Sequence, residues 1–119
     1  MSVESDLSAA LELLLPGKVY PDLAPQGAVA PYIVYQQAGG ESPSFLENAT
    51  PTKRNARMQV SVWGTTRAAV IALALQIEQA VVTTSTLNGR PLSAFVSLYD
   101  EDTKLRGATQ DFSIWGNRA

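Results

Sequence analysis

The sequence contains neither cysteine nor histidine among its 119 residues. Without cysteine there is no disulfide framework and no thiolate nucleophile, and without histidine an acyl-transfer triad loses its usual base. Zinc sites lose their usual nitrogen and sulfur ligands for the same reason. These absences exclude the commonest forms of nucleophilic and zinc-dependent catalysis. The sequence is therefore interpreted as that of a protein that is not an enzyme and holds no metal or cofactor.

Charged residues are also scarce, at 17% of the chain, against about 25% in a typical soluble domain. Together with a hydrophobic content of 45%, this favours a small domain that covers part of its surface by assembling with partners. The net charge of −2 gives no indication of bulk or sequence-specific nucleic-acid binding. No stretch is long enough to cross a bilayer, and no signal peptide is recognisable, so we expect assembly in a cytosol without membrane partners.

Two patterns that could indicate a ligand fail on closer inspection. The acidic run at residues 100–102 does not continue as a calcium loop, because Lys104 and Leu105 occupy the next ligand position and the glycine position. The glycines fit no phosphate-binding pattern. Paired carboxylates for hydrolysis stay an open alternative, as does a small cytosolic ligand-binding domain, because nothing in the sequence places two acids in a pocket.

The chain is organised around residues 58–82. Apolar residues alternate along 58–63, which predicts a half-buried strand, and then recur with a helical period from residue 67. Gly64 breaks the strand, and Thr65 or Thr66 is expected to cap the helix. The inward residues of the strand are Met58, Val60 and Val62, and those of the helix are Val70, Leu73, Ile77 and Val81.

The same helix carries a second apolar stripe, formed by Ile71, Leu75 and Val82 and interrupted by Glu78. A surface helix needs only one such stripe, so the second one indicates a second partner. That partner is either the first helix of this chain, which is the simpler interpretation, or a neighbouring subunit.

Other segments complete the pattern. A first helix is expected from Ser2 or Ser5 to about Leu15, and the proline-rich connection 18–31 is expected to be extended and ordered. A charged turn is expected at residues 100–106. Further strands are expected at residues 32–37, 93–99 and 107–115.

This order predicts an α+β fold: a mostly antiparallel four-stranded sheet with two helices packed on one face, in a single domain of residues 1–119. The opposite face of the sheet is too polar for a core and carries two tryptophans, so it either faces solvent or meets a partner. Its residues are Gln59, Ser61, Trp63, Asp111, Ser113 and Trp115.

A long loop is expected at residues 39–55. Loops of this length are uncommon in compact domains and are usually functional or mobile. The segment is polar except for Phe45 and Leu46, and it ends in the basic residues Lys53 and Arg54. A binding arm and an ordinary hairpin connection are equally compatible with this composition.

Several short motifs follow one another along the chain, and their order and spacing identify a family more specifically than any single motif does. They are a short leucine-rich N-terminal helix, Val19-Tyr20-Pro21-Asp22, Ala24-Pro25-Gln26-Gly27, Pro31-Tyr32-Ile33-Val34-Tyr35, the segment 56–63 running into an alanine-rich helix, and the closing strand Asp111-Phe112-Ser113-Ile114-Trp115. In this arrangement the chain resembles the small tail-terminator, or tail-completion, proteins of long-tailed bacteriophages and prophages.

The resemblance implies a structural virion protein at the head-tail junction. Such proteins form a ring, commonly a hexamer, on the tail tube, which ends tail polymerisation and offers a joining surface to head-completion or neck proteins, with packaged DNA passing through the ring. A head-closure or stopper protein is the structural alternative. No catalytic residue belongs to the family pattern. The residues expected at interfaces are Glu41, Phe45, Leu46, Glu47, Lys53, Arg54, Ile71 and Leu75.

Overall fold

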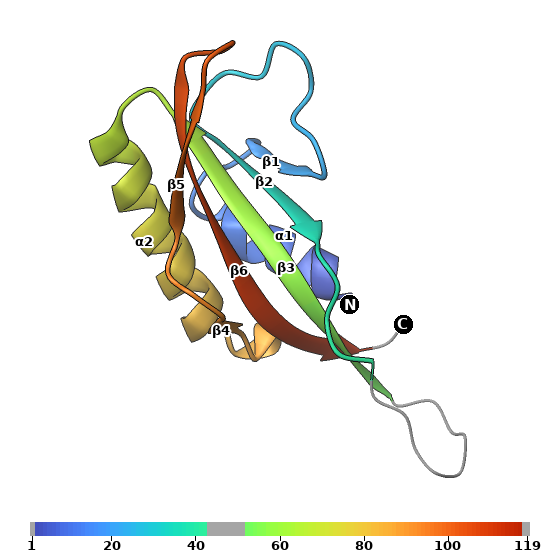
Figure 1. The fold of residues 1–119 in the computed structure, drawn as a ribbon. Helices are drawn as coiled ribbons and strands as arrows, with labels where there is room; N and C mark the ends of the chain where they lie inside the picture. Colours follow the sequence, from blue (N-terminus) through green and yellow to red (C-terminus); the bar gives the residue numbers. More distant parts are fainter. Residues whose placement is uncertain (1, 43–51, 118–119) are drawn as a thin grey trace.

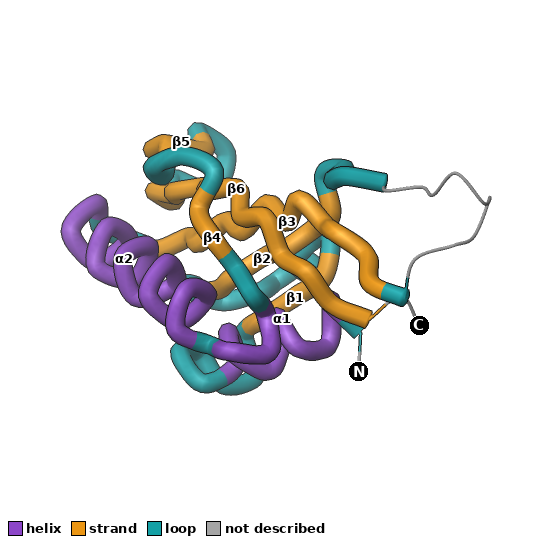
Figure 2. The backbone as a smooth tube through the Cα atoms, turned by 90° about the horizontal axis from the view of Figure 1, so that it is seen from below, coloured by secondary structure: helices purple, strands orange, loops and turns teal. Residues whose placement is uncertain are grey.

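The computed structural model describes residues 2–42 and 52–117, which form two helices on one face of a six-stranded sheet. Figure 1 shows the sheet with the helices behind it, and Figure 2 shows both helices on the same side of the strands. The helices are α1 (Val3–Glu12) and α2 (Arg67–Thr83), with one 3₁₀ turn at Ser85–Leu87. The strands are β1 (Val19–Pro21), β2 (Tyr32–Gln37), β3 (Lys53–Gly64), β4 (Arg90–Pro91), β5 (Val96–Asp100) and β6 (Leu105–Asn117).

The strands lie in the order β1-β2-β3-β6-β4, and β5 pairs with the first part of β6. The α+β class is confirmed, and so are two helices on one face. The sheet is mixed rather than antiparallel throughout, because β1 runs parallel to β2, and it has six strands rather than four. The two strands missed from sequence are short and end in Pro21 and Pro91, and both lie at sheet edges, where a missing N–H removes no ladder hydrogen bond.

Helix α1 begins with a reciprocal cap. The Ser2 hydroxyl oxygen accepts a hydrogen bond from the N–H of Ser5, and the Ser5 hydroxyl oxygen accepts one from the N–H of Ser2, each at 3.1 Å. The helix ends at Glu12, earlier than the expected Leu15, and the Glu12 carboxylate accepts a hydrogen bond from the N–H of Gly17 at 2.7 Å. Gly17 has φ of +74°, which favours glycine at the stop.

Helix α2 begins at the expected cap, where the Thr66 hydroxyl accepts a hydrogen bond from the N–H of Ala69 at 3.2 Å. The predicted inward stripe is confirmed, with Leu73 only partly buried and Ala74 buried beside it. Both helices close one core over the inner face of the sheet. Its largest fully buried side chains include Leu7, Leu11, Ile33, Met58, Phe112 and Ile114.

Strands β3 and β6 form the central, longest pair of the sheet. All twelve residues of β3 pair with β6, from Lys53 opposite Asn117 to Gly64 opposite Arg106. The expected strand start at Met58 and loop end at Asn55 are therefore wrong: β3 begins at Lys53. Its first residues are mostly polar and show no apolar alternation, so only their backbone pairing with β6 identifies them as a strand.

Candidate interaction surfaces

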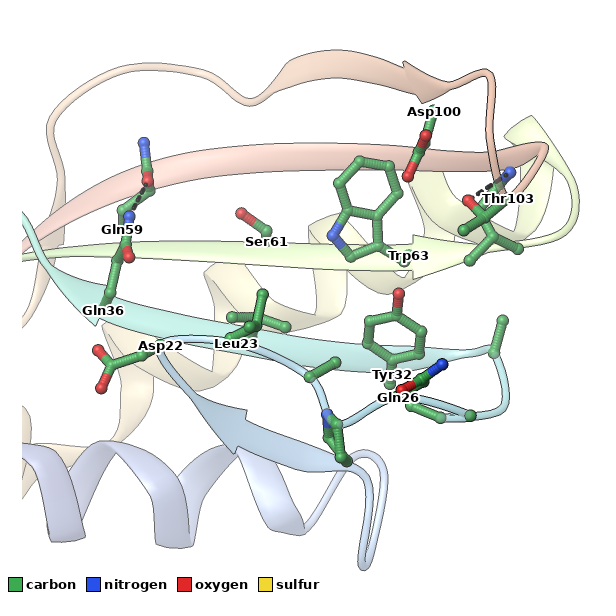
Figure 3. Close-up of a pocket in the computed structure, with 17 residues that line it drawn as sticks. Asp22, Leu23, Gln26, Tyr32, Gln36, Gln59, Ser61, Trp63, Asp100 and Thr103 are labelled. Carbon is green, nitrogen blue, oxygen red and sulfur yellow. Dashed lines mark hydrogen bonds between the residues drawn. The ribbon is translucent and has the colours of Figure 1, made fainter.

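A groove of about 660 Å³ lies on the sheet face opposite the helices, at the end of β3 (Figure 3). Its floor consists of cross-strand pairs from β2 and β3. One wall is the loop of residues 22–30, and the other is the turn between β5 and β6. The paired floor residues are Tyr32 with Trp63, Val34 with Ser61, and Gln36 with Gln59.

Polar side chains of the floor form hydrogen bonds across the strands, within the floor and to β6. The Gln36 Nε2 group donates to Gln59 Oε1 at 2.9 Å, and the Ser61 hydroxyl donates to Thr109 Oγ1 at 3.0 Å. These contacts hold the side chains of Gln36, Gln59 and Ser61 in place. The expected polar outer face is thus present, but most of it is half-buried rather than fully open.

Farther along this face, the polar side chains bond to other residues of the same chain. The Arg57 Nε group donates to Asp111 Oδ2 at 2.7 Å. The buried Asn55 side chain donates to Ser113 Oγ at 2.8 Å and accepts a hydrogen bond from the N–H of Glu41 at 2.8 Å. This half of the face is thus an internal network, whereas the half near Trp63 forms the groove.

Trp63 lies in the groove between Asp100 and Tyr32 (Figure 3). Its indole ring sits over Gly107, where an added Cβ would meet two ring carbons at 2.7 Å. Only glycine therefore leaves room for the ring in this position. Burial raises the pKa of Tyr32, and the negative charge of Asp100 and the neighbouring Tyr20 raise it further.

The outer face of α2 is a second exposed surface. Leu75 is 53% exposed and Val82 is 49% exposed. The simpler expectation, that the first helix covers this stripe, is therefore wrong for these two residues. Ala68 and Ala72 are exposed on the same side, and Ile71 is half-buried.

The two charged residues of α2 both serve contacts within the chain. The Arg67 guanidinium donates to the carbonyl oxygens of Gly107 at 3.0 Å and Leu98 at 3.1 Å. The Glu78 carboxylate accepts a hydrogen bond from Gln110 Nε2 at 2.7 Å. Arg67 and Glu78 are both half-buried, and the exposed residues of α2 are all uncharged. They are Ala68, Ala69, Ala72, Leu75, Gln76, Gln79, Val82 and Thr83.

The other expected interface residues are placed as follows. Lys53 donates from Nζ to Asn117 Oδ1 at 2.7 Å, and Arg54 forms an ion pair with Glu4, so both basic side chains already have partners within the chain. Glu41 is exposed. Contact of any of these residues with a neighbour stays a prediction. Phe45, Leu46 and Glu47 lie outside the described residues.

The ion pair between Glu4 and Arg54 has a consequence for pH. The Arg54 side chain donates from Nη2 to Glu4 Oε1 at 2.6 Å, and this hydrogen bond is the main reason why the pKa of Glu4 is below its ordinary value of 4.5. A depressed folded pKa means that the pair stabilises the fold above about pH 4.5 and that this contribution disappears as the pH falls through the lower folded pKa. Both side chains are partly exposed, so solvent screening limits the gain to about 1 kcal/mol.

We therefore expect Glu4→Gln to reduce the free energy of unfolding at pH 6 and the two proteins to converge below pH 4.5, as measured by urea denaturation. Glu101→Gln removes the same charge from an exposed turn and is expected to have no such effect. A difference between wild type and Glu4→Gln that is equal at both pH values would contradict this assignment.

Metal and membrane sites are not indicated by the described part of the chain. In residues 2–42 and 52–117, no group of three or more acidic residues is placed to hold a metal ion. None of the described helices is long and apolar enough to span a membrane.

Comparisons with known proteins place the chain in a family. A family model described as tail completion protein gp17 matches residues 7–116. The fold is similar to a chain in the virion of a native gene transfer agent (GTA) particle, with a TM-score of 0.63 and 19% sequence identity over 98% of this chain and 92% of that chain. No curated relative matches at a significant level. Because the family model covers nearly the whole chain, the chain belongs to the tail completion protein gp17 family and is a structural protein of a phage-type tail.

Proposed function

We propose that this protein caps the end of the tail tube as a ring, ends tail polymerisation and provides the surface to which head-completion proteins join. It acts through shape-matched surfaces rather than by catalysis. The observation that carries the proposal is the uncharged outer face of α2, with Leu75 and Val82 exposed on it, in a protein of a tail-completion family.

A closed ring needs two different complementary patches on each subunit. The outer face of α2 has the character expected of one of them. Leu75 and Val82 provide apolar area, while Ala68 and Ala72 allow close approach of a neighbour. Burying a leucine completely is worth about 1.5–3 kcal/mol, and Leu75 still has roughly half of its surface to bury.

The size of this face also bears on when the ring forms. A stable protein interface engages about 20–30 residues on each side, and a single helix face offers far fewer. We expect the subunit to be a monomer in dilute solution. The ring, a hexamer by resemblance, then forms where the tube end holds several subunits together.

Loss of the protein from the particle tests this role. When its gene is deleted from the encoding phage or prophage, we expect electron microscopy to show abnormally long tails or tails without heads, because nothing stops the growing tube. A plasmid copy should restore normal particles. Normal tails accompanied by leaking, tailless heads would instead indicate a head-closure or stopper role and would overturn the proposal.

A further inference from the structure

We propose that the groove above β2 and β3 binds an extended segment of another virion protein through a lysine or arginine side chain. The inference uses the tail role only to name a virion protein as the source of the segment, and it does not depend on ring formation. It rests on the charge, the aromatic residues and the shape of the groove.

The charge of the groove is one-sided. Asp22 and Asp100 line it from opposite walls, and no lysine or arginine is among its described lining residues. The nearby Arg106 is held over the ring of Tyr99, 4.5 Å from the centroid, rather than in the groove. Two carboxylates without a lining cation attract a basic side chain and repel phosphate groups, which disfavours DNA or lipid headgroups as the occupant.

The aromatic pair of the floor fits the same ligand. Trp63 and Tyr32 are direct cross-strand partners, and a cation over an aromatic face is attracted by the ring quadrupole. Both rings are held in place before any ligand binds. The close approach of Gly107 positions Trp63, and the ring of Tyr20 packs edge-on to Tyr32 with centroids 6.1 Å apart. Such a preorganised pair loses little freedom on binding.

The remaining lining suits an extended backbone. The volume of about 660 Å³ lies within the range of about 300–1,000 Å³ typical of ligand sites. Gln26, Gln36 and Gln59 supply amide groups that pair with peptide N–H and C=O groups, and Leu23, which is 82% exposed, supplies an apolar wall. An extended segment presents alternate side chains to such a surface.

A different protein fits better than a second copy of this chain. Four arginines of the described residues already bind within the subunit: Arg54 to Glu4, Arg57 to Asp111, Arg67 to backbone carbonyls and Arg106 to Tyr99. Lys53 donates to Asn117. The other described cations, Lys18, Arg90 and Lys104, lie in backbone that is already hydrogen-bonded within the subunit, so none belongs to a free extended segment. The basic segment therefore comes from a neighbouring protein of the particle.

A peptide titration of the full-length, ¹⁵N-labelled protein tests the ligand chemistry. The probes are the peptides acetyl-TVRVT-amide and acetyl-TVQVT-amide, which differ only in the central basic side chain. We expect the arginine peptide to shift the indole N–H of Trp63 and the side-chain amides of Gln36 and Gln59. It should bind about fivefold more tightly than the glutamine peptide, as an attraction of about 1 kcal/mol between its charge and the groove carboxylates would give.

Variants assign this preference to the two carboxylates. The double variant Asp22→Asn, Asp100→Asn should lose the preference for arginine. The turn should stay intact, because asparagine at position 100 keeps the side-chain oxygen that accepts a hydrogen bond from the N–H of Asp102 at 3.0 Å. The double variant Glu101→Gln, Asp102→Asn removes the same charge from exposed positions outside the groove and should keep the preference. Equal binding of both peptides overturns the proposal. So does the absence of any shift at these amides at about 5 mM peptide, because a complex with a Kd of about 1 mM would then be mostly formed.

Crosslinking within assembled particles identifies the source of the segment. With a photo-crosslinking residue at Ser61 in the groove floor, we expect mass spectrometry to find a segment of another virion protein that contains lysine or arginine. A crosslinker at Leu13, which is exposed on the helix side, should not capture that segment. Crosslinks from Ser61 to a second copy of this chain, or to a segment without a basic residue, overturn the proposal. A failed ring would leave the peptide titration unchanged, so the two proposals are tested separately.

Discussion

Leu75→Lys is expected to prevent assembly of the ring while leaving the subunit folded. The side chain is half exposed on the outer face of α2, and lysine is a good helix former, so the free energy of unfolding should change by less than about 0.5 kcal/mol. In an interface the new charge would be buried without a partner, at a cost of about 3–5 kcal/mol, which weakens association by a factor of roughly 150 to 4,000. Urea denaturation measures the first effect, and the number of complete particles in micrographs measures the second.

Leu13→Lys provides the matched control. Leu13 follows α1 and is 84% exposed, so the substitution introduces the same charge at a still more accessible leucine away from α2. We expect this variant to give normal particles. Normal particles from Leu75→Lys as well would show that the outer face of α2 is not a subunit interface, and the proposed ring contact would be wrong.

Removal of residues 43–51 is expected to have the second large effect. The loop expected from the sequence spans residues 39–55, but its first residues do not belong to the part that can be removed. A Cβ at Gly40 would meet the Asn55 carbonyl oxygen at 2.7 Å, and the N–H of Glu41 binds the Asn55 side chain, so both residues belong to the packed fold. Joining Ser42 to Thr52 through a short glycine-serine linker should change the free energy of unfolding by less than about 1 kcal/mol, because closure entropy depends weakly on loop length.

The same deletion should abolish head-tail joining if Phe45 and Leu46 anchor the segment on a neighbour or on the tube. Heads and tails would then be found separated in micrographs of particles made with this variant. Replacing residues 43–51 by glycine and serine at unchanged length separates the role of the side chains from that of the span, and we expect the same loss. Normal virions from the deletion would rule out a binding arm.

The sequence predicted best those elements whose side chains alternate between core and solvent. The middle of β3 was predicted from the alternating Met58, Val60 and Val62, because burial of one sheet face imposes a period of two. The middle of β6 was predicted in the same way from Phe112 and Ile114. The start of β3 was missed for the converse reason. Lys53 and Arg54 are held in the strand by backbone pairing and by contacts with Asn117 and Glu4, distant residues that no local pattern reveals.

The groove was only half predictable. The alternation in β3 placed Ser61 and Trp63 on an outer face, and that face is the floor of the groove. Its walls come from residues 22–30 and from the β5–β6 hairpin, whose positions depend on tertiary packing rather than on local propensity. Asp22 and Asp100 are 78 residues apart in the chain, so only the structure brings their charges to one site.

The long pairing of β3 with β6 also sets an order of events during synthesis. The ribosome releases β3 before α2, yet β6, the last of the described elements, is its partner along all twelve residues. Until β6 appears, β3 has only β2 beside it, along residues 58–63, and residues 53–56 have no strand beside them among the described elements. Such distant pairing gives the chain a high contact order, so its native sheet closes late and slowly compared with a helical protein of the same size.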